Sequence, residues 1–264
     1  MPQKLSRTIV IVQARMGASR LPGKVLRTLA GKTVLAHVLE RCAAIANIDG
    51  VCCATTENSQ DDAVAEEAKL AGVTIFRGSE NDVLERYAGA AIEMNADVIL
   101  RVTADCPLID PDICACVLKA RENTHTDYAS NNSPPSFPHG LDCEVFSIDW
   151  LLRAAKEARK PSEREHVTPY IRNHPDAKQA NFTCEKSNVA HHRWTLDTAA
   201  DWDFFKSLFS LLPDGPENWS WCVPLDIVCS NPEISQLNAG QDRYEGLNKT
   251  LAEDEVAGFA KSGR

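Results

Sequence analysis

The segment QARMGASRLPGK, Gln13–Lys24, is the stretch of this chain that decides its interpretation. It directly follows a short apolar run rich in β-branched residues, which predicts a buried strand over Thr8–Gln13. The segment contains two glycines, a serine and three cations, namely Arg15, Arg20 and Lys24. Glycine lets the backbone approach a ligand closely, and backbone N–H groups with Arg and Lys suit phosphate oxygens. The segment therefore predicts a loop that binds a polyphosphate at the carboxyl end of the first strand.

This loop differs from the Walker A loop of ATPases, G-x-x-x-x-G-K-[ST]. Five residues rather than four separate Gly17 from Gly23, and Val25 replaces the Ser or Thr that binds Mg²⁺. An ATPase-type P-loop is therefore not expected. The alternative to a phosphate-binding loop is an ordinary surface loop whose cations are solvated.

The composition excludes several classes of protein. The chain has 264 residues, of which 44% are hydrophobic, so it can bury the core of one large domain. The net charge of -9 and the pI near 5.3 argue against a nucleic-acid binder, which usually has a basic face. No apolar run approaches the roughly 20 residues of a membrane span, and no signal peptide is expected. We therefore expect a cytoplasmic protein that binds neither nucleic acid nor membrane.

The ten cysteines are scattered and form no pair of C-x-x-C units. We expect most of them to be small buried hydrophobic residues in a reducing compartment rather than disulfide or zinc ligands. Cys106 follows a candidate catalytic aspartate, so a nucleophilic role is the alternative for this residue. No local His partner accompanies it.

The first half of the chain alternates strand-like and helix-like segments. Strands are expected at Thr8–Gln13, Gly50–Thr55, Val73–Arg77 and Asp97–Thr103. Helical periodicity predicts helices over Thr33–Ile45, Gln60–Ala71, Asp82–Met94 and Pro111–Arg121. This order indicates an α/β fold with a mostly parallel sheet, helices on both faces, and ligands at the carboxyl ends of the strands.

The second half is less regular. A turn-rich loop at Asn131–Pro135 is long enough for a substrate-binding excursion. Further elements are expected as a strand at Glu144–Ser147, helices near Asp149–Arg159 and Glu163–His174, a short strand at His192–Leu196, and a helix after Thr198. We expect residues 1–264 to form a single domain, with 225–264 as a polar helical tail.

Two aspartates, Asp105 and Asp197, each follow a strand-like segment. Carboxylates that meet at one edge of a sheet can hold Mg²⁺ together with substrate phosphates. Each aspartate also has a structural alternative, because Asp105 can open the turn before Pro107 and Asp197 can cap a helix. Combined with the cationic loop, the pair predicts a metal site.

Three further polar clusters are candidates for substrate contacts. The segment Phe76–Leu84 ends a strand and opens a helix, with a glycine for close approach. A second cluster suits a sugar or a polar acid and comprises His139, Gly140, Asp142 and Glu144. A third, at a helix start, offers Arg164 and His166 to an anionic substrate, its alternative being a capping box from Ser162 to Glu165.

The N-terminal pattern A-R-x-x-x-S-R-L-P-G-K in Ala14–Lys24 resembles the signature of the cytidylyltransferase family that includes CMP-KDO and CMP-acylneuraminate synthetases. The chain is most similar to the branch called spore coat polysaccharide biosynthesis protein F. The similar segments are Gln13–Lys24, Arg77–Tyr87, Arg101–Asp110, Gly140–Phe146, Ser162–Tyr170 and Arg193–Thr198. Thr103–Pro107 departs from the Gln-Gly-Asp-Glu-Pro pattern of the KDO enzymes, which leaves base preference and acceptor open.

The resemblance implies the nucleotide-diphospho-sugar transferase fold, which is Rossmann-like, with Mg²⁺ as cofactor and CTP as nucleotide. It implies that Asp105 and Asp197 bind the metal and that Arg15, Lys24 and Asp105 are catalytic. The implied nucleotide-binding residues are Gln13, Ala14, Arg15, Gly17, Ser19, Arg20, Lys24, Arg77, Ser79 and Asp82. Related synthetases are often dimers, so the resemblance also suggests a homodimer.

The expected reaction is attack by an oxygen of an anionic sugar or sugar acid on the α-phosphate of CTP, with release of pyrophosphate. The product would serve surface polysaccharide or glycoconjugate biosynthesis. One alternative is a glycosyltransferase of the same fold that uses a nucleotide sugar, for which Asp110-Pro111-Asp112 offers an Asp-x-Asp motif. The other alternative is a non-catalytic nucleotide-binding protein.

Overall fold

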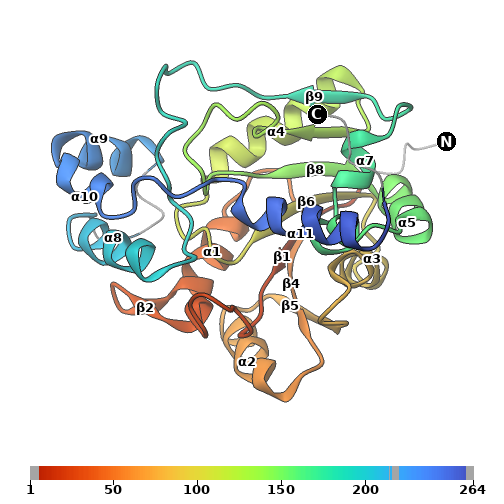
Figure 1. Ribbon diagram of the computed structural model, residues 1–264, viewed down its shortest axis with the longest axis horizontal. Coiled ribbons are helices and arrows are strands. Elements are labelled where there is room, and N and C mark those ends of the chain that lie inside the picture. Colours follow the sequence, from red (N-terminus) through yellow and green to blue (C-terminus); the bar gives the residue numbers. More distant parts are fainter. Residues whose placement is uncertain (1–5, 214, 216–219, 260–264) are drawn as a thin grey trace.

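A seven-stranded sheet runs through the molecule (Figure 1). The computed structural model describes residues 6–213, 215 and 220–259. In spatial order the strands are β5 (Thr74–Gly78), β4 (Gly50–Thr56), β1 (Thr8–Gln13), β6 (Val98–Thr103), β8 (Glu144–Ser147), β7 (Tyr128–Ser130) and β9 (Gln179–Asn181). Of these, only β8 runs antiparallel to its neighbours β6 and β7. The predicted mostly parallel sheet is confirmed.

Strand β1 is buried on both faces, as expected for a central strand of a parallel sheet. Its side chains alternate, so that Val10 and Val12 join the hydrophobic cluster on one face while Ile9 and Ile11 join the cluster on the other. The register aligns Gln13 of β1 with Thr103 of β6, and the Ala104 N–H donates to the Gln13 carbonyl at 3.1 Å. The segments that follow the two strands therefore leave the sheet side by side.

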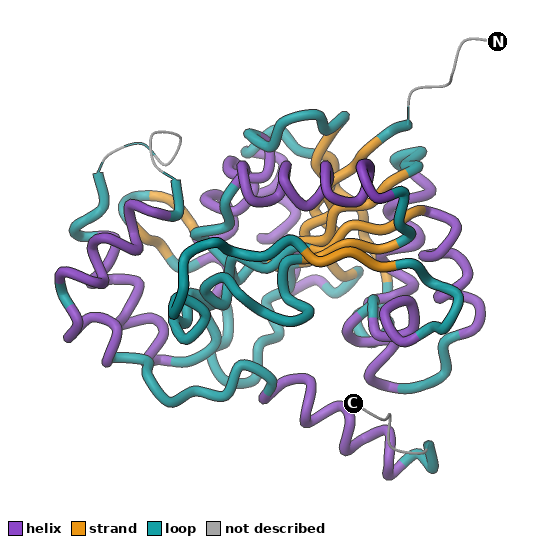
Figure 2. The backbone as a smooth tube through the Cα atoms, turned by 90° about the horizontal axis from the view of Figure 1, so that it is seen from above, coloured by secondary structure: helices purple, strands orange, loops and turns teal. Residues whose placement is uncertain are grey.

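Helices cover both faces of this sheet (Figure 2). The face of Val10 is covered by α1 (Val34–Ala43), α2 (Asp62–Leu70) and α4 (Pro111–Thr124). The face of Ile9 is covered by α3 (Val83–Glu93), α5 (Ile148–Glu157) and α7 (Pro169–Asn173). The hydroxyl of Thr33 accepts the Ala36 N–H at 3.0 Å and caps α1, as its position predicts.

A third hydrophobic cluster lies beside the sheet, where α8 (Ala199–Phe209), α9 (Cys222–Ser230) and α10 (Pro232–Gln236) gather (Figure 1). The fully buried Trp194 belongs to this cluster. Leu29 joins it from a short hairpin formed by β2 (Thr28–Leu29) and β3 (Lys32–Thr33). Two 3₁₀ turns, η1 (Lys24–Leu26) and η2 (Ser59–Asp61), complete the N-terminal half.

Two expected elements differ in the structure. The strand expected at His192–Leu196 is reduced to an isolated bridge between Arg193 and His139. The helix expected at Glu163–His174 is divided into α6 (Pro161–His166) and α7, because Val167 has a φ of 70° and Pro169 has no N–H to continue the ladder. The three-residue strands β7 and β9 were not predicted, since so short a run has no detectable period.

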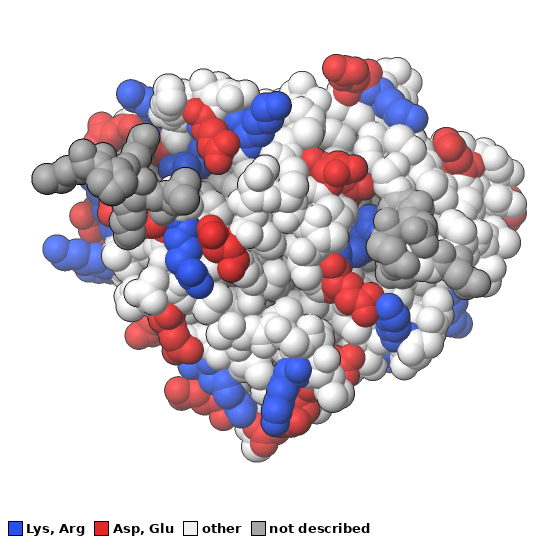
Figure 3. Space-filling view, turned by 180° about the vertical axis from the view of Figure 1, so that it is seen from behind, with Lys and Arg blue, Asp and Glu red and all other residues white. Residues whose placement is uncertain are grey.

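The C-terminal segment ends in α11 (Glu245–Val256), which packs against α6. Residues 260–264 of the predicted tail lie outside the described part of the chain. On the face shown in Figure 3, acidic and basic side chains of the described residues are interspersed rather than gathered into a patch of one sign. Within the described ranges, none of the helices combines the length and the apolarity needed to cross a lipid bilayer.

Candidate active site

The loop after β1 is held in shape by the buried Asp61. One oxygen of its carboxylate accepts the Met16 N–H at 2.6 Å, and the other accepts the hydroxyl of Thr56. The Gly23 N–H donates to the Met16 carbonyl at 3.1 Å, and Gly23 has a φ of 67°, a conformation that glycine adopts without strain. These contacts close the loop and place Lys24 at its end.

The ammonium of Lys24 lies between the two predicted metal ligands. Its Nζ atom is 2.7 Å from Oδ2 of Asp105 and 2.6 Å from Oδ1 of Asp197. The Leu196 N–H donates to the Asp105 carbonyl at 2.8 Å and so ties together the backbones that carry the two aspartates. The structure thus unites three residues that are distant in sequence.

The charges of this group depend on one another. Burial by itself lowers the pKa of Lys24, but the adjacent carboxylates outweigh it and raise that pKa above its ordinary value. Burial by itself raises the pKa of Asp105, yet the charge of Lys24 and hydrogen bonds, including one from the Thr103 hydroxyl at 2.6 Å, hold it well below the ordinary range. Lys24 is therefore a cation and Asp105 an anion at neutral pH.

The donor chemistry of this group fits Mg²⁺. Within the described residues, no group of three or more His, Cys, Asp or Glu side chains is arranged to hold a metal ion. Mg²⁺ in phosphate-transfer sites commonly takes one or two carboxylates and completes its shell with substrate phosphates and water. Asp105 and Asp197 supply such a pair, because Oδ2 of Asp105 and Oδ1 of Asp197 both face the position of the Lys24 Nζ atom.

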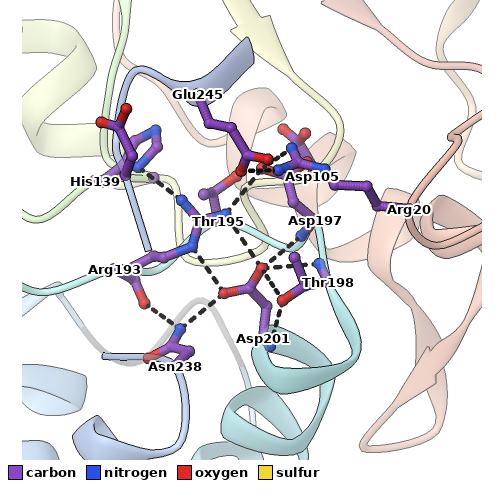
Figure 4. Close-up of polar contacts among 12 residues, drawn as sticks. Arg20, Asp105, His139, Arg193, Thr195, Asp197, Thr198, Asp201, Asn238 and Glu245 are labelled. Carbon is purple, nitrogen blue, oxygen red and sulfur yellow. Dashed lines mark hydrogen bonds and ion pairs between the residues drawn. The ribbon is translucent and has the colours of Figure 1, made fainter. Parts of the chain in front are cut away.

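Arg193 forms a hydrogen bond with the carboxylate of Asp197 (Figure 4). Its Nη2 atom donates to Oδ2 of Asp197 at 3.0 Å, and its Nε atom donates to Oδ1 of Asp201 at 2.8 Å. The opposite edge of the guanidinium lies 3.5 Å from Nδ1 of His139. The N-cap of α8 is Thr198 rather than Asp197, so the capping alternative for Asp197 is wrong.

A cavity of about 600 Å³ opens at this edge of the sheet. Its walls include most of the predicted site residues: Gln13, Ala14, Arg15, Gly17, Ser19, Arg20, Lys24, Asp105, His139, Asp142, Glu144, His166 and Asp197. The walls are more polar than apolar, and they join the first loop to β6, β8 and α11. The cavity therefore combines most of the predicted nucleotide and substrate residues in one place.

Five predicted residues are not part of the cavity wall formed by the described chain: Arg77, Ser79, Asp82, Gly140 and Arg164. Arg77 pairs with Asp62 at 2.6 Å and donates to the carbonyls of Thr56 and Asn58. The hydroxyl of Ser79 accepts the Asp82 N–H at 3.1 Å. Asp82 caps α3 and pairs with Arg164. In this structure Arg77, Asp82 and Arg164 connect elements of the scaffold, and the Ser79 side chain closes the turn before α3.

Gly140 serves the packing of the backbone. Its φ is 112°, and a Cβ atom at this position would lie 2.1 Å from the carbonyl oxygen of Trp194. His139 exchanges backbone hydrogen bonds with the segment that carries Trp194, donating to the His192 carbonyl and accepting the Trp194 N–H. Glycine at position 140 therefore allows two segments of the backbone to pack closely beside the cavity.

Glu144 is a buried anion whose oxygens are engaged. It accepts hydrogen bonds from Arg101 at 2.6 Å, from the Tyr128 hydroxyl at 2.6 Å and from the Thr168 hydroxyl at 2.7 Å. Burial favours the neutral acid, but the charge of Arg101 outweighs it and lowers the pKa of Glu144. Arg101 also donates to the side chain of Gln13 at 3.1 Å. Glu144 therefore orients Arg101 in the cavity wall.

Cys106 has the geometry of a protonated thiol. Its Sγ atom lies 3.5 Å from Oδ1 of Asp105, to which the thiol donates. Burial and the charge of Asp105 raise the pKa of Cys106 well above its ordinary value. A protonated thiol is a poor nucleophile, so the structure disfavours the alternative in which Cys106 is a covalent nucleophile. All ten cysteines are free thiols.

Several residues of the cavity wall were not predicted: Arg86, Arg101, Arg193, Thr195 and the C-terminal Asp242, Arg243, Glu245 and Lys249. Arg193 begins the segment Arg193–Thr198, so its neighbourhood carried a signal. Arg243 donates to Asp142, and Glu245 accepts from Arg20. Nothing in the local sequence links these C-terminal residues to the first loop, because only tertiary contacts join them.

Comparisons with known proteins identify the family of this chain. A family model described as cytidylyltransferase matches residues 9–205. The spore coat polysaccharide biosynthesis protein SpsF of Bacillus subtilis is 32% identical over 216 residues, which cover 79% of this chain and 89% of that protein. The structure of a cytidylyltransferase from Leptospira borgpetersenii superposes with a TM-score of 0.82 at 33% identity, covering 90% of this chain and 98% of that one.

Two more distant structures show the fold alone. CMP-2-keto-3-deoxy-manno-octonic acid synthetase complexed with CTP has a TM-score of 0.61 at 18% identity, with 78% of this chain and 99% of that chain covered. A manganese complex of Rv0371c from Mycobacterium tuberculosis has a TM-score of 0.54 at 15% identity, with coverages of 78% and 100%. With the matched residues and the shared fold, this chain belongs to the cytidylyltransferase family and is a nucleotidyltransferase of the nucleotide-diphospho-sugar transferase fold.

Proposed function

We propose that this protein transfers the cytidylyl group of CTP to an anionic sugar or sugar acid, with release of pyrophosphate, for surface polysaccharide or glycoconjugate biosynthesis. The observation that carries the proposal is the Lys24 ammonium between Asp105 and Asp197 at the end of a phosphate-binding type of loop. We further propose a cytoplasmic location, where CTP is available, and a homodimer, as the resemblance to CMP-sugar synthetases suggests.

The loop after β1 binds the triphosphate in this proposal. Arg15 is suited to phosphate because its ion pairs with Glu80 and Glu165 are long, 3.6 Å each, and its side chain is about one-third exposed. Lys24 exchanges its carboxylate partners for phosphate oxygens and offsets the charge that develops on the departing pyrophosphate. Positioning and charge neutralisation are the main tasks of such a site.

Asp105 and Asp197 hold the metal in this proposal. Mg²⁺ bound there would polarise the α-phosphate and offset its negative charge. Asp105 is kept ionised by its surroundings and is available as a ligand once Lys24 turns to the triphosphate. The acceptor side of the cavity comprises His139, Asp142, Glu144 and His166, with Arg101 and Arg243 as the cations beside them.

The glycosyltransferase alternative depends on the motif Asp110-Pro111-Asp112. Asp110 is only 1% exposed, and its carboxylate caps α4 by accepting the N–H groups of Asp112 and Ile113 at 3.0 Å. Its second oxygen accepts the Trp221 N–H at 2.7 Å. A carboxylate engaged in this way is a poor metal ligand, so the structure favours nucleotidyl transfer.

The test is a comparison of CTP, GTP, UTP and ATP, each with and without Mg²⁺, by thermal stability and by pyrophosphate release. A ligand at a hundred times its dissociation constant adds about 2.7 kcal/mol to the free energy of unfolding. We expect a Mg²⁺-dependent shift with CTP, and pyrophosphate release when KDO or N-acetylneuraminate is added as a probe acceptor. Stabilisation by a UDP- or GDP-sugar, with none by CTP, would favour the glycosyltransferase instead.

A further inference from the structure

The two carboxylate oxygens of Asp197 have different partners. Oδ1 faces Lys24 at 2.6 Å, whereas Oδ2 accepts from Nη2 of Arg193 at 3.0 Å and lies 3.5 Å from Nη2 of Arg20. A carboxylate on a free side chain rotates about its terminal bond, and this torsion has a broad minimum. Arg193 removes that freedom and keeps one oxygen pointed at the position that Lys24 occupies.

Arg193 is itself held rigidly. Its side chain is 8% exposed, and it forms a two-point contact with the fully buried Asp201, from Nε to Oδ1 at 2.8 Å and from Nη2 to Oδ2 at 3.2 Å. The Oδ2 atom of Asp201 also accepts the backbone N–H of Asp197 at 3.0 Å and that of Thr198 at 2.9 Å. One buried carboxylate therefore fixes both the arginine and the backbone that carries Asp197 (Figure 4).

The third member of this group comes from the C-terminal segment. Asn238 is 3% exposed, and its Nδ2 atom donates to the Arg193 carbonyl at 2.9 Å and to Oδ1 of Asp201 at 3.0 Å. Asn238 lies beyond residue 205, where the family match ends. The role of the C-terminal tail is not evident from the sequence. These hydrogen bonds join the tail to the backbone of Arg193, the residue that contacts Asp197.

We propose that Arg193, Asp201 and Asn238 are positioning residues that orient the Asp197 carboxylate toward the divalent cation of the metal–nucleotide complex. The inference rests on the proposed function, because it takes Asp197 as a metal ligand. Groups that hydrogen-bond to metal ligands orient them, and their loss lowers metal affinity by about 10–100-fold. Asn238, which is not part of the cavity wall formed by the described residues, thus contributes to nucleotide binding through Arg193 and Asp201.

A purely structural role is the competing explanation, since Asp201 also belongs to a capping box with Thr198 at the start of α8. The two explanations predict different behaviour. Loss of a structural contact lowers stability, and any effect on CTP binding is the same with and without metal. Loss of a positioning contact reduces only the part of the CTP affinity that depends on the metal.

The experiment is calorimetric titration of the protein with CTP, once with excess Mg²⁺ and once with EDTA. The ratio of the two dissociation constants gives the gain in affinity that the metal provides. For Asn238→Ala and for Arg193→Lys we expect this gain to fall by about tenfold, the lower end for such contacts, while the affinity for metal-free CTP stays within about twofold. Arg193→Lys retains the charge but loses the planar two-point contact, so it tests orientation separately from charge.

The matched control is Val228→Ala, which removes apolar volume from α9 in the hydrophobic cluster that also contains Trp194 and Leu196, and which removes no polar group. It should lower the melting temperature and leave the metal-dependent gain unchanged. Variants of Asn238 and Arg193 that keep the wild-type gain would overturn the inference and leave the proposed function standing. A wild-type protein that binds CTP equally well with Mg²⁺ and with EDTA would overturn the metal site itself, and the inference with it.

Discussion

The ammonium of Lys24 donates a hydrogen bond to Asp105 at 2.7 Å, although the two lie 81 positions apart in the sequence. The contact spans the gap between the segments that leave β1 and β6, and it couples the charges of both residues. Each residue should therefore be sensitive to the loss of the other. Because Lys24 also contacts Asp197, a substitution of Asp105 still leaves the lysine with one carboxylate partner.

Asp105→Asn should leave the fold intact and nearly abolish turnover. Asn has almost the same volume and still accepts the Thr103 hydroxyl, but it lacks the charge that binds a cation. Loss of one group that stabilises transition-state charge costs about 10²–10³ in rate. Pyrophosphate release from CTP measures the effect, with the exposed Asp112→Asn as a matched control. Activity close to that of the wild type would exclude Asp105 as a metal ligand.

Lys24→Met should weaken CTP binding far more than acceptor binding. The substitution keeps the unbranched side chain up to the Cε position and removes a charged hydrogen bond to phosphate, which contributes about 1.5–3 kcal/mol, or roughly 10–100-fold in affinity. Calorimetric titration with CTP measures the change. Lys69→Met, on the exposed face of α2, is the control and should bind as the wild type does. An unchanged affinity in Lys24→Met would remove this residue from the triphosphate site.

Folding stability should fall as the pH is lowered from about 6.5 to about 4. Burial and the charge of Arg101 lower the pKa of His166 to about 4, and burial with the charge of His191 lowers that of His192 to about 4. The unfolded chain binds these protons near pH 6.5 and the folded chain does not, so protonation favours unfolding within this window. Each histidine contributes a slope of at most about 1.4 kcal/mol per pH unit.

Urea denaturation at several pH values measures this slope. His166→Gln should reduce it, whereas His125→Asn, at an exposed position whose φ of 51° suits Asn, should not. An identical slope in His166→Gln and the wild type would contradict the assignment of His166 as a neutral, half-buried side chain.

Gly140→Ala should be strongly destabilising. The added Cβ would lie 2.1 Å from the Trp194 carbonyl oxygen. This atom belongs to the backbone, so it can move away only if the whole segment around Trp194 moves. Gly240→Ala is the matched control, since Gly240 also has a positive φ, of 80°, but no atom lies within 4 Å of the added Cβ. The control should lose about 1 kcal/mol through backbone strain alone, and Gly140→Ala should lose several times more. Equal melting temperatures for the two variants would show that the backbone segments at Gly140 and Trp194 can move apart at little cost.

Cys106→Ser should retain activity. The serine hydroxyl can replace the thiol as a donor to Asp105, and the raised pKa of Cys106 means that no thiolate is lost. Steady-state rates of pyrophosphate release, with circular dichroism to establish folding, measure the outcome. Complete loss of activity in a folded Cys106→Ser protein would return the covalent mechanism to consideration.

Local patterns predicted much of the fold. The β-branched run at Thr8–Gln13 and the periodic apolar residues of α1 and α3 are properties of a few neighbouring residues, so they can be recognised without tertiary information. The division of α6 from α7 could not be predicted from the period. It results from the positive φ of Val167, a fully buried residue held by its surroundings.

Sequence patterns alone determined that this chain forms a mostly parallel α/β sheet, that a cationic glycine-containing loop follows its first strand, and that Asp105 and Asp197 are the candidate ligands. Only the tertiary structure decided that Lys24 lies between those aspartates, that Arg77, Asp82 and Arg164 connect scaffold elements, and that Asn238 supports Arg193. The physical reason is that periodicity and turn chemistry act over a few residues. The orientation of a buried carboxylate depends instead on donors brought to it from distant segments when the core packs.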